Sequence, residues 1–263
     1  MRSIDIKESQ QILLDIAKCV DSICQKNNIP FYMLGGTMLG AIRHKGFIPW
    51  DDDMDFGVPY DKYYQLIELL EKELPSQYRC LTYENSETML EFFVKIEDVT
   101  TLVKDVRLDI PLKQQPGLTI DIFPLVSCGE AAFETIVPKV RKLYLKKRRV
   151  FIGSTDHSKI KNVIKKILRL VVPYSSLSLN REMKKLTDKI APGDYICNIS
   201  SPHYWDRPLP KEYFEPIVKY PFENTEFSGI TQYDKYLSEL YNNYMQIPPK
   251  EKQEVHLDNV FKR

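Results

Sequence analysis

The amino-acid sequence predicts an α+β fold, with a mixed sheet and flanking helices followed from about residue 128 by a mainly helical region. Up to residue 127, short apolar runs typical of strands alternate with segments whose apolar residues recur every three or four positions. Beyond that point the strand-like runs fade and helical spacing dominates. The chain has 263 residues, 43% hydrophobic and 28% charged, which suits a globular protein with a sizeable core.

The first elements predict a strand, a glycine turn and a helix. An amphipathic helix is expected over residues 8–27 and a buried strand over 31–34. Gly35 and Gly36 then turn the chain into a helix over 37–43, with Thr37 in position to cap it. A helix that starts after such a turn directs its first backbone N–H groups toward an anion. We therefore expect Gly35, Gly36 and Thr37 to form a phosphate-binding turn.

The remaining elements follow from the same patterns. Glu97-Asp98 is interpreted as a hairpin turn between two strands. A loop rich in proline and aromatic residues is expected over 201–221. The further strands are expected over 53–58, 78–83, 91–96, 100–106 and 118–125, and the further helices over 61–73, 130–150, 158–172, 177–190 and 233–246.

Four aspartates fall within five residues, at positions 51, 52, 53 and 55. One interpretation is a solvated acidic loop. The other is a site for a cation, because clustered carboxylates repel one another unless a positive charge lies among them. Asp53 and Asp55 alternate with apolar residues, so in a strand they would project from the same face. A further carboxylate, Asp121, lies within the apolar run LTIDIFPL, where burial would require a partner.

The spacing of the aspartates excludes an EF-hand. That loop would require glycine at position 56 and glutamate at position 62, where this chain has Phe56 and Lys62. Carboxylates on neighbouring strands suit Mg²⁺ or Mn²⁺ held beside phosphate. We therefore predict that Asp53, Asp55 and Asp121 form a metal site with one or two ions. Neither a Walker P-loop nor a GxGxxG motif is present in the sequence.

Two basic residues are candidates for contact with substrate phosphates. Arg43 either satisfies the C-terminal end of its helix or binds phosphate through its planar guanidinium group. Lys95, in the strand-like run FFVKIED, either extends to solvent from the edge of the core or contacts phosphate.

The net charge of +1 conceals a basic segment over residues 139–169. It contains twelve Lys or Arg and one acidic residue, so the remainder of the chain is strongly acidic. The segment is interpreted either as solvated helix faces or as a peripheral contact with an anionic membrane. No nucleic-acid recognition motif accompanies the charge, so nucleic acid is not an expected partner.

Cysteine usage and the lack of long apolar runs bear on location. The five cysteines show no metal or disulfide spacing, which indicates reduced thiols. No apolar leader and no run of about 18 apolar residues is found. We expect a cytoplasmic protein, with any membrane contact at the inner face.

The sequence resembles the LicD family of the nucleotidyltransferase superfamily. The matching stretches are LGGTMLGAIRHKGFIPWDDDMDFGVP (34–59), VKIED (94–98), LTIDIFPL (118–125) and YDKYLSELYNNYMQIPPKEKQEVH (233–256). One departure is visible in the last stretch. Where the family usually has Tyr-Gly-Asp-Tyr, this chain has Tyr241-Asn242-Asn243-Tyr244.

The resemblance implies a nucleotidyltransferase-like catalytic core over 1–127 and a helical region over 128–263 that completes the acceptor site. It implies Asp53 and Asp55 as the metal pair, Asp121 as the third carboxylate, and a donor held at the glycine turn. The implied reaction moves phosphocholine from CDP-choline to a sugar hydroxyl of a teichoic acid, capsule or lipopolysaccharide precursor, which can be lipid-linked. Trp50, Tyr204 and Trp205 are candidates for an aromatic cage around choline.

Three alternatives to this reaction remain open. The first is transfer of another phosphoalcohol, ribitol or glycerol phosphate. The second is nucleotidyl transfer. The third is a non-catalytic module that binds anionic lipid or glycan through the basic segment.

Overall fold

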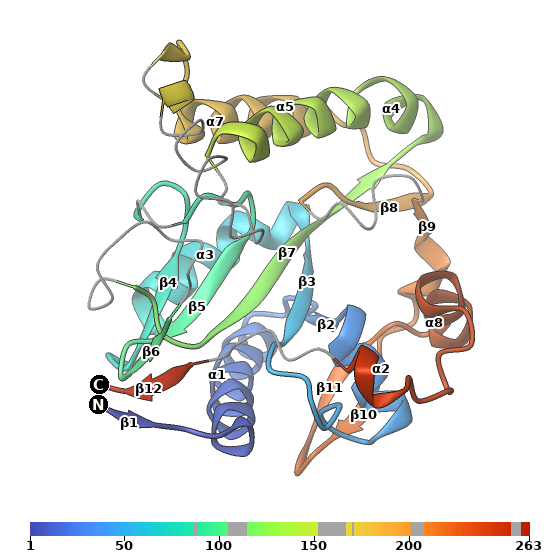
Figure 1. Ribbon diagram of the computed structural model, residues 1–263. Helices are drawn as coiled ribbons and strands as arrows, with labels where there is room; N and C mark the ends of the chain where they lie inside the picture. Colours follow the sequence, from blue (N-terminus) through green and yellow to red (C-terminus); the bar gives the residue numbers. More distant parts are fainter. Residues whose placement is uncertain (87–88, 105–114, 152–166, 170, 201–207, 254–258) are drawn as a thin grey trace.

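The computed structural model of the protein contains strands from both halves of the chain (Figure 1). It describes residues 1–86, 89–104, 115–151, 167–169, 171–200, 208–253 and 259–263. The strands are β1 (Arg2–Ser3), β2 (Tyr32–Met33), β3 (Asp55–Pro59), β4 (Tyr78–Leu81), β5 (Val94–Asp98), β6 (Thr101–Val103), β7 (Thr119–Cys128), β8 (Tyr195–Asn198), β9 (Leu209–Pro210), β10 (Val218–Phe222), β11 (Thr225–Gly229) and β12 (Val260–Lys262). The helices are α1 (Ile6–Lys26), α2 (Gly35–Arg43), α3 (Tyr60–Glu73), α4 (Glu130–Thr135), α5 (Val137–Val150), α7 (Ser176–Thr187) and α8 (Tyr233–Tyr241).

These strands form a large mixed sheet and a small one. The large sheet has nine strands in the order β10-β11-β2-β3-β7-β5-β4, with β8 paired to β7 and β9 paired to β8. Strand β3 runs parallel to β7, whereas β5 and β8 run antiparallel to it. The small sheet has the order β1-β12-β6. The predicted α+β class and mixed sheet are confirmed.

Helices α1 and α3 pack on the large sheet and on each other. Helix α1 begins after Asp5, whose side chain accepts a hydrogen bond from the Glu8 N–H at 2.9 Å. In the sheet, Phe56 is buried and stacks on Phe31. Because strand side chains alternate between faces, Asp55 projects to the opposite face. The apolar stripe of α1 consists of Leu13, Leu14, Ile16, Ala17, Val20 and Ile23.

The predicted hairpin at Glu97-Asp98 is wrong. Both residues lie inside β5, which pairs with β4 and β7, whereas β6 pairs with β12 in the small sheet. Glu97 is fully buried, and its carboxylate accepts hydrogen bonds from the Arg79 guanidinium at 2.7 Å and the Gly117 N–H at 2.8 Å. An ion pair between the buried Glu97 and the exposed Arg79 thus replaces the turn that the acidic dipeptide suggested.

The C-terminal region contains the expected helices α4, α5, α7 and α8, and it also contributes strands. Residues 218–222 and 225–229 form the antiparallel pair β10 and β11, and β11 pairs with β2 of the N-terminal region. The division of the chain into 1–127 and 128–263 stays a prediction. The expected helix over 158–172 lies largely outside the described residues, as does the first part of the loop expected over 201–221.

A second core lies between β7, β8 and the helices α4, α5 and α7, at the top of Figure 1. One lysine of the basic segment belongs to it. Lys147 is fully buried on α5, where its ammonium donates to Asn180 Oδ1 at 2.8 Å and lies 3.7 Å from Glu91 Oε2. Burial lowers the pKa of Lys147 to about 8, although the Glu91 charge opposes that shift.

All five cysteines are free, and all but Cys19 are buried, as expected of reduced thiols. Among the described residues, no helix combines the length and the apolar character needed to cross a membrane.

We expect the buried ammonium of Lys147 to make stability depend on pH. Between about pH 8 and the ordinary lysine value, the unfolded chain binds the proton more tightly, so the free energy of unfolding should rise with pH across this range. Lys147→Met should flatten the rise, whereas Lys142→Met, at an exposed position of the same helix, should not. Urea unfolding at several pH values checks this. Parallel pH profiles for the wild-type protein and Lys147→Met would contradict it.

Candidate active site

Three neighbouring strands place two carboxylates and one ammonium in a single row. Asp55 on β3 is the register partner of Asp121 on β7, and Lys95 on β5 is the partner of Asp121 from the other side. The Lys95 ammonium lies 2.5 Å from Asp121 Oδ1. Opposed residues of paired strands project from the same face. The sequence-predicted residues Asp55, Asp121 and Lys95 are therefore neighbours on the face opposite Phe56.

Asp53 precedes β3, which begins two residues later than the sequence suggested. Its negative charge nevertheless acts on Asp55 and Asp121. Desolvation and the negative charges of Asp53 and Asp121 raise the pKa of Asp55 well above its ordinary value. Desolvation also raises the pKa of Asp121, although the Lys95 ammonium opposes that shift. The negative charge of these carboxylates is therefore greater than the single positive charge of Lys95 can neutralise.

The donor set fits a divalent cation in ligand type and charge. Carboxylate oxygens are the ligands that Mg²⁺ and Mn²⁺ prefer, and a cation would relieve the repulsion that raises the pKa of Asp55. Among the described residues, no three acidic, histidine or cysteine side chains lie close enough together to bind one metal ion. The ion pair with Lys95 holds one oxygen of Asp121 in the present arrangement.

The glycine turn adjoins the carboxylates, but its details differ from the prediction. Helix α2 begins at Gly35 itself, whose φ of 49° favours glycine, and Leu34 is the N-cap residue. Thr37 lies inside the helix and does not cap it. Its hydroxyl instead accepts a hydrogen bond from the Asp55 N–H at 2.8 Å. Thr37 therefore ties the first turn of α2 to the start of the carboxylate strand.

Gly36 leaves room for an acidic side chain. A Cβ atom at this position would lie 2.8 Å from Asp51 Oδ2, so the Asp51 carboxylate lies against the first turn of α2. The positive end of the helix dipole favours an anion there. The Gly35 N–H already donates to the Tyr236 hydroxyl at 2.9 Å. The Asp51 carboxylate and the Tyr236 hydroxyl therefore lie at the turn where the sequence predicted a substrate phosphate.

Arg43 lies at the other end of α2. Its guanidinium donates to the Tyr244 carbonyl at 2.8 Å and lies near the Gln246 carbonyl at 3.4 Å. Burial lowers the pKa of Arg43, and the charge of the Tyr241 phenol opposes that shift. The residue therefore holds the segment that follows α8.

The predicted aromatic cage is only partly described. The Trp50 ring packs edge-on against His44, with ring centroids 6.4 Å apart, and Trp50 directly precedes Asp51 in the chain. Tyr204 and Trp205 lie outside the described residues.

Sequence reasoning missed two tyrosines of α8. Tyr236 is fully buried and binds the glycine turn through its hydroxyl. Tyr241, at the end of α8, is 41% exposed. Desolvation and the charges of Tyr236, Asp55, Asp51 and Asp53 raise its pKa, which places its phenol near the carboxylates.

The family's C-terminal motif was the signal that could have found Tyr241. Asn242 stands where that motif has glycine, and its φ is 56°. Asparagine adopts positive φ more readily than other residues with a side chain. Asn242 therefore adopts a positive φ at the position where the family motif has glycine.

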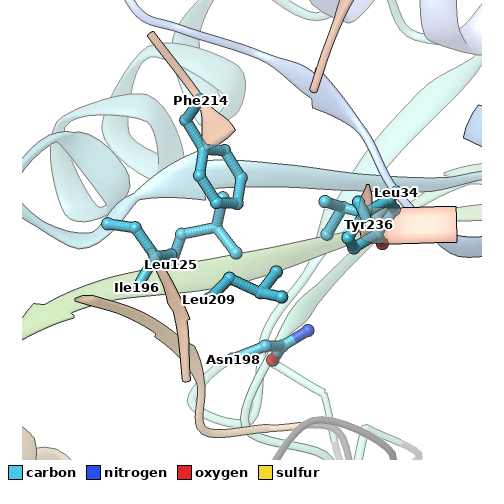
Figure 2. Close-up of a pocket in the computed structure, with 7 residues that line it drawn as sticks. All are labelled: Leu34, Leu125, Ile196, Asn198, Leu209, Phe214 and Tyr236. Atoms are coloured by element: carbon cyan, nitrogen blue, oxygen red, sulfur yellow. The ribbon is translucent and has the colours of Figure 1, made fainter. Parts of the chain in front are cut away.

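Figure 2 shows a small, mostly apolar pocket whose lining includes Leu34, the residue before the glycine turn. Leu34 and Tyr236 belong both to its wall and to the surroundings of Gly35. Asn198 Oδ1 accepts a hydrogen bond from the Ser200 N–H at 3.2 Å, but its buried amide nitrogen has no hydrogen-bond partner among the described residues. The lining consists of Leu34, Leu125, Ile196, Asn198, Leu209, Phe214 and Tyr236.

We expect Thr37→Val to test the link between the turn and the carboxylate strand. The change keeps the shape of the buried side chain but leaves the Asp55 N–H without its acceptor, which should cost about 1–3 kcal/mol of stability. Thr135→Val, at an exposed hydroxyl that donates to the Ala131 carbonyl, is the matched control. Thermal and urea unfolding measure both variants. Equal stability of the two would contradict the assigned role of Thr37.

Comparison with known proteins places this site in a family. Residues 28–151 match the nucleotidyltransferase domain described as LicD/FKTN/FKRP. The lipopolysaccharide cholinephosphotransferase LicD of Haemophilus influenzae is 28% identical over 266 residues, which cover 97% of each chain. An uncharacterized protein of Rickettsia prowazekii is 33% identical over 87 residues, covering 31% of this chain and 32% of its own.

A shorter stretch of the chain is similar to an animal protein. The human ribitol 5-phosphate transferase FKRP is 37% identical over 46 residues, covering 18% of this chain and 9% of its own. The matched domain contains the glycine turn and the three aspartates on which the predicted site depends, and the bacterial match runs almost from end to end. Residues 28–151 thus match the LicD family, and the similarity to a LicD protein extends over nearly the whole chain.

Proposed function

We propose that this chain is a transferase that moves phosphocholine from CDP-choline to a sugar hydroxyl of a cell-surface glycan. The observation that carries the proposal is the row of Asp55, Asp121 and Lys95 beside the glycine turn. The near full-length similarity to a lipopolysaccharide cholinephosphotransferase supports the group transferred and the class of acceptor. A teichoic acid or capsule precursor, lipid-linked or free, is within the same acceptor class.

Asp53, Asp55 and Asp121 are the residues that would hold Mg²⁺ or Mn²⁺. The ion would neutralise charge on the diphosphate and on the departing CMP. The protein's own contribution begins at α2, whose first turn carries the backbone N–H groups of Gly36 and Thr37 toward an anion. The Asp51 carboxylate lies against this turn, so phosphate binding there requires Asp51 to move or to share the cation.

Asp121 is the candidate general base. Its raised pKa improves a carboxylate as a proton acceptor, and the ion pair with Lys95 fixes the orientation of one of its oxygens. The acceptor hydroxyl would lose its proton to Asp121 as its oxygen attacks the phosphorus atom of the phosphocholine group. The bond to the CMP oxygen would break on the opposite side. Lys95 would act on this step by holding Asp121.

Other transfers on the same site are distinguishable by their products. Similarity to a ribitol 5-phosphate transferase over 46 residues supports transfer of ribitol or glycerol phosphate as the alternative. Both reactions release CMP, whereas nucleotidyl transfer releases pyrophosphate. A non-catalytic module that binds lipid or glycan would release neither.

The decisive experiment measures CMP release with Mg²⁺ from CDP-choline, CDP-ribitol and CDP-glycerol, with a panel of glycan acceptors. Asp53→Asn should lower the rate about a hundredfold or more, because each 1.4 kcal/mol of lost transition-state stabilisation costs a factor of ten. Asp61→Asn, an exposed aspartate of α3, should leave the rate unchanged. Failure to bind any CDP-alcohol with Mg²⁺, measured by calorimetry, would overturn the proposed transferase.

We also propose that the enzyme works at the inner face of the membrane, with α5 against anionic lipid. The outward side of α5 carries exposed cations and no acidic residue. The Arg169 guanidinium donates to the Val150 and Phe151 carbonyls, which places residues 167–169 at the end of α5. Large exposed apolar side chains gather here, as interfacial helices require. They are Leu145, Ile167, Leu168 and Val171, and the exposed cations of α5 are Lys139, Lys142, Lys146, Arg148 and Arg149.

Vesicle flotation tests this membrane contact. The protein should float with vesicles that contain phosphatidylglycerol and not with pure phosphatidylcholine, and high salt should weaken binding. Lys146→Glu with Arg149→Glu should weaken it about tenfold or more, since each basic residue near such a surface contributes about 1 kcal/mol. Lys7→Glu with Lys72→Glu, on α1 and α3, is the charge-matched control. Equal binding of both double variants would contradict the contact.

A further inference from the structure

Two buried cysteines lie against each other where the chain enters and leaves the helices at the top of Figure 1. Cys128 is the last residue of β7, and Cys197 lies on the neighbouring strand β8. Their sulfur atoms are 2.9 Å apart. The chain between them contains α4, α5 and α7. A covalent bond between the two sulfur atoms would therefore close a loop that contains these three helices.

The backbones beside the two thiols are held at close range by contacts that do not use sulfur. The Ser127 hydroxyl donates to the Gly193 carbonyl at 2.9 Å and accepts from the Gly193 N–H at 3.1 Å. A Cβ atom at Gly193 would lie 2.5 Å from Gly129 Cα, so this approach requires glycine. The ladder between β7 and β8 adds its own hydrogen bonds. These contacts keep the thiols close independently of the thiols' own interaction.

The separation of the two sulfur atoms is close to that of a disulfide. In the ladder Cys128 pairs with Tyr195 and Cys197 pairs with Val126, so the cysteines are diagonal neighbours on one face of the sheet. An S–S bond is about 2.05 Å long, so the sulfur atoms would have to approach by about 0.9 Å. Thermal displacements of about 0.5 Å per axis are ordinary in a folded protein. The bond therefore needs no rearrangement of the strands.

The two thiols differ in acidity because of their contact. The hydrogen bond with Cys197 lowers the pKa of the Cys128 thiol, whereas the same contact and burial raise the pKa of Cys197. The thiolate is the nucleophilic form of cysteine. Cys128 is therefore the thiol that reacts first with an oxidant, and Cys197 is its resolving partner.

We propose that Cys128 and Cys197 form a reversible disulfide when the protein meets hydrogen peroxide. The Cys128 sulfur attacks one peroxide oxygen and the O–O bond breaks, which gives a sulfenic acid and water. The Cys197 sulfur then attacks the Cys128 sulfur, and the sulfenic oxygen leaves as a second water. Two thiols thus lose two protons and two electrons, and one peroxide is reduced. Local opening of β8, a strand of four residues, admits a molecule this small.

The test uses the full chain, in which all five cysteines are free. Peroxide should lower the number of thiols, titrated under denaturing conditions, by two, and dithiothreitol should restore them. Mass spectrometry should find fragments joined through Cys128 and Cys197, about 2 Da lighter than the reduced pair. Because the bond closes a long loop, the oxidised protein should melt about 5 °C or more above the reduced protein.

Three alanine variants control the measurement. Cys128→Ala and Cys197→Ala each remove one partner, so peroxide should not raise their melting temperatures. Cys80→Ala, at a buried cysteine of β4, keeps the pair and should gain as much as the wild-type protein. Each variant is compared with its own reduced form, so a lower starting stability does not affect the result. If an alanine variant does not fold, the joined fragments of the wild-type protein decide the question.

Several results would overturn the inference. They are a full set of thiols after peroxide, a disulfide that joins other cysteines, and sulfinic acid at Cys128 or Cys197 in place of the bond. Equal melting temperatures of the oxidised and reduced wild-type protein would show that the bond does not constrain the helices, and would likewise overturn it. None of these results depends on the proposed transferase activity.

Discussion

The pairing of β3, β7 and β5 is the constraint on which the site depends. It aligns Asp55, Asp121 and Lys95 across three strands, so two carboxylates and one ammonium cannot move apart without breaking the sheet. Carboxylates brought together out of bulk water lose hydration and repel each other, and desolvation followed by this repulsion raises the pKa of Asp55. Backbone pairing and the apolar core on the opposite face must supply the free energy that holds them there.

Around this row, the structure uses polar contacts between segments far apart in sequence. Thr37 joins α2 to the start of β3, and Tyr236 joins α8 to the start of α2. These contacts explain why a glycine turn and an acidic run occur together in one stretch of the sequence. The Asp55 N–H finds its acceptor in the first turn of α2, and the Gly35 N–H finds its acceptor in α8.

Sequence periodicity predicted much of the fold because α1, α3 and β7 bury continuous apolar faces, which leave a clear pattern. It failed where partners are distant in sequence. Glu97 was interpreted as a turn residue because its partners, Arg79 and Gly117, are not visible as neighbours. Strand β10 was missed because its proline and aromatic residues are equally typical of a loop, and its partner β11 was missed with it.

For the candidate site, too, the sequence predicted residues marked by a local pattern but not the contacts between distant segments. Alternation placed Asp55 on a polar face, and the isolated charge of Asp121 in an apolar run marked it as a residue that needs a partner. The pairing of Asp121 with Lys95 required the register of β5 on β7, which local patterns do not contain. The contribution of Tyr236 required the packing of α8 on α2, because its position in the sequence is 201 residues from Gly35.

The attachment of α8 to the glycine turn has a consequence for biosynthesis. The Gly35 N–H and the Tyr236 hydroxyl are 201 residues apart, and β2 takes its outer neighbour, β11, from residues 225–229. Contacts this distant in sequence form late, since the intervening chain must first be present and ordered. A nascent chain therefore cannot complete the turn beside the aspartates until α8 emerges from the ribosome. Translation that stops before α8 would leave the Gly35 N–H without its Tyr236 partner.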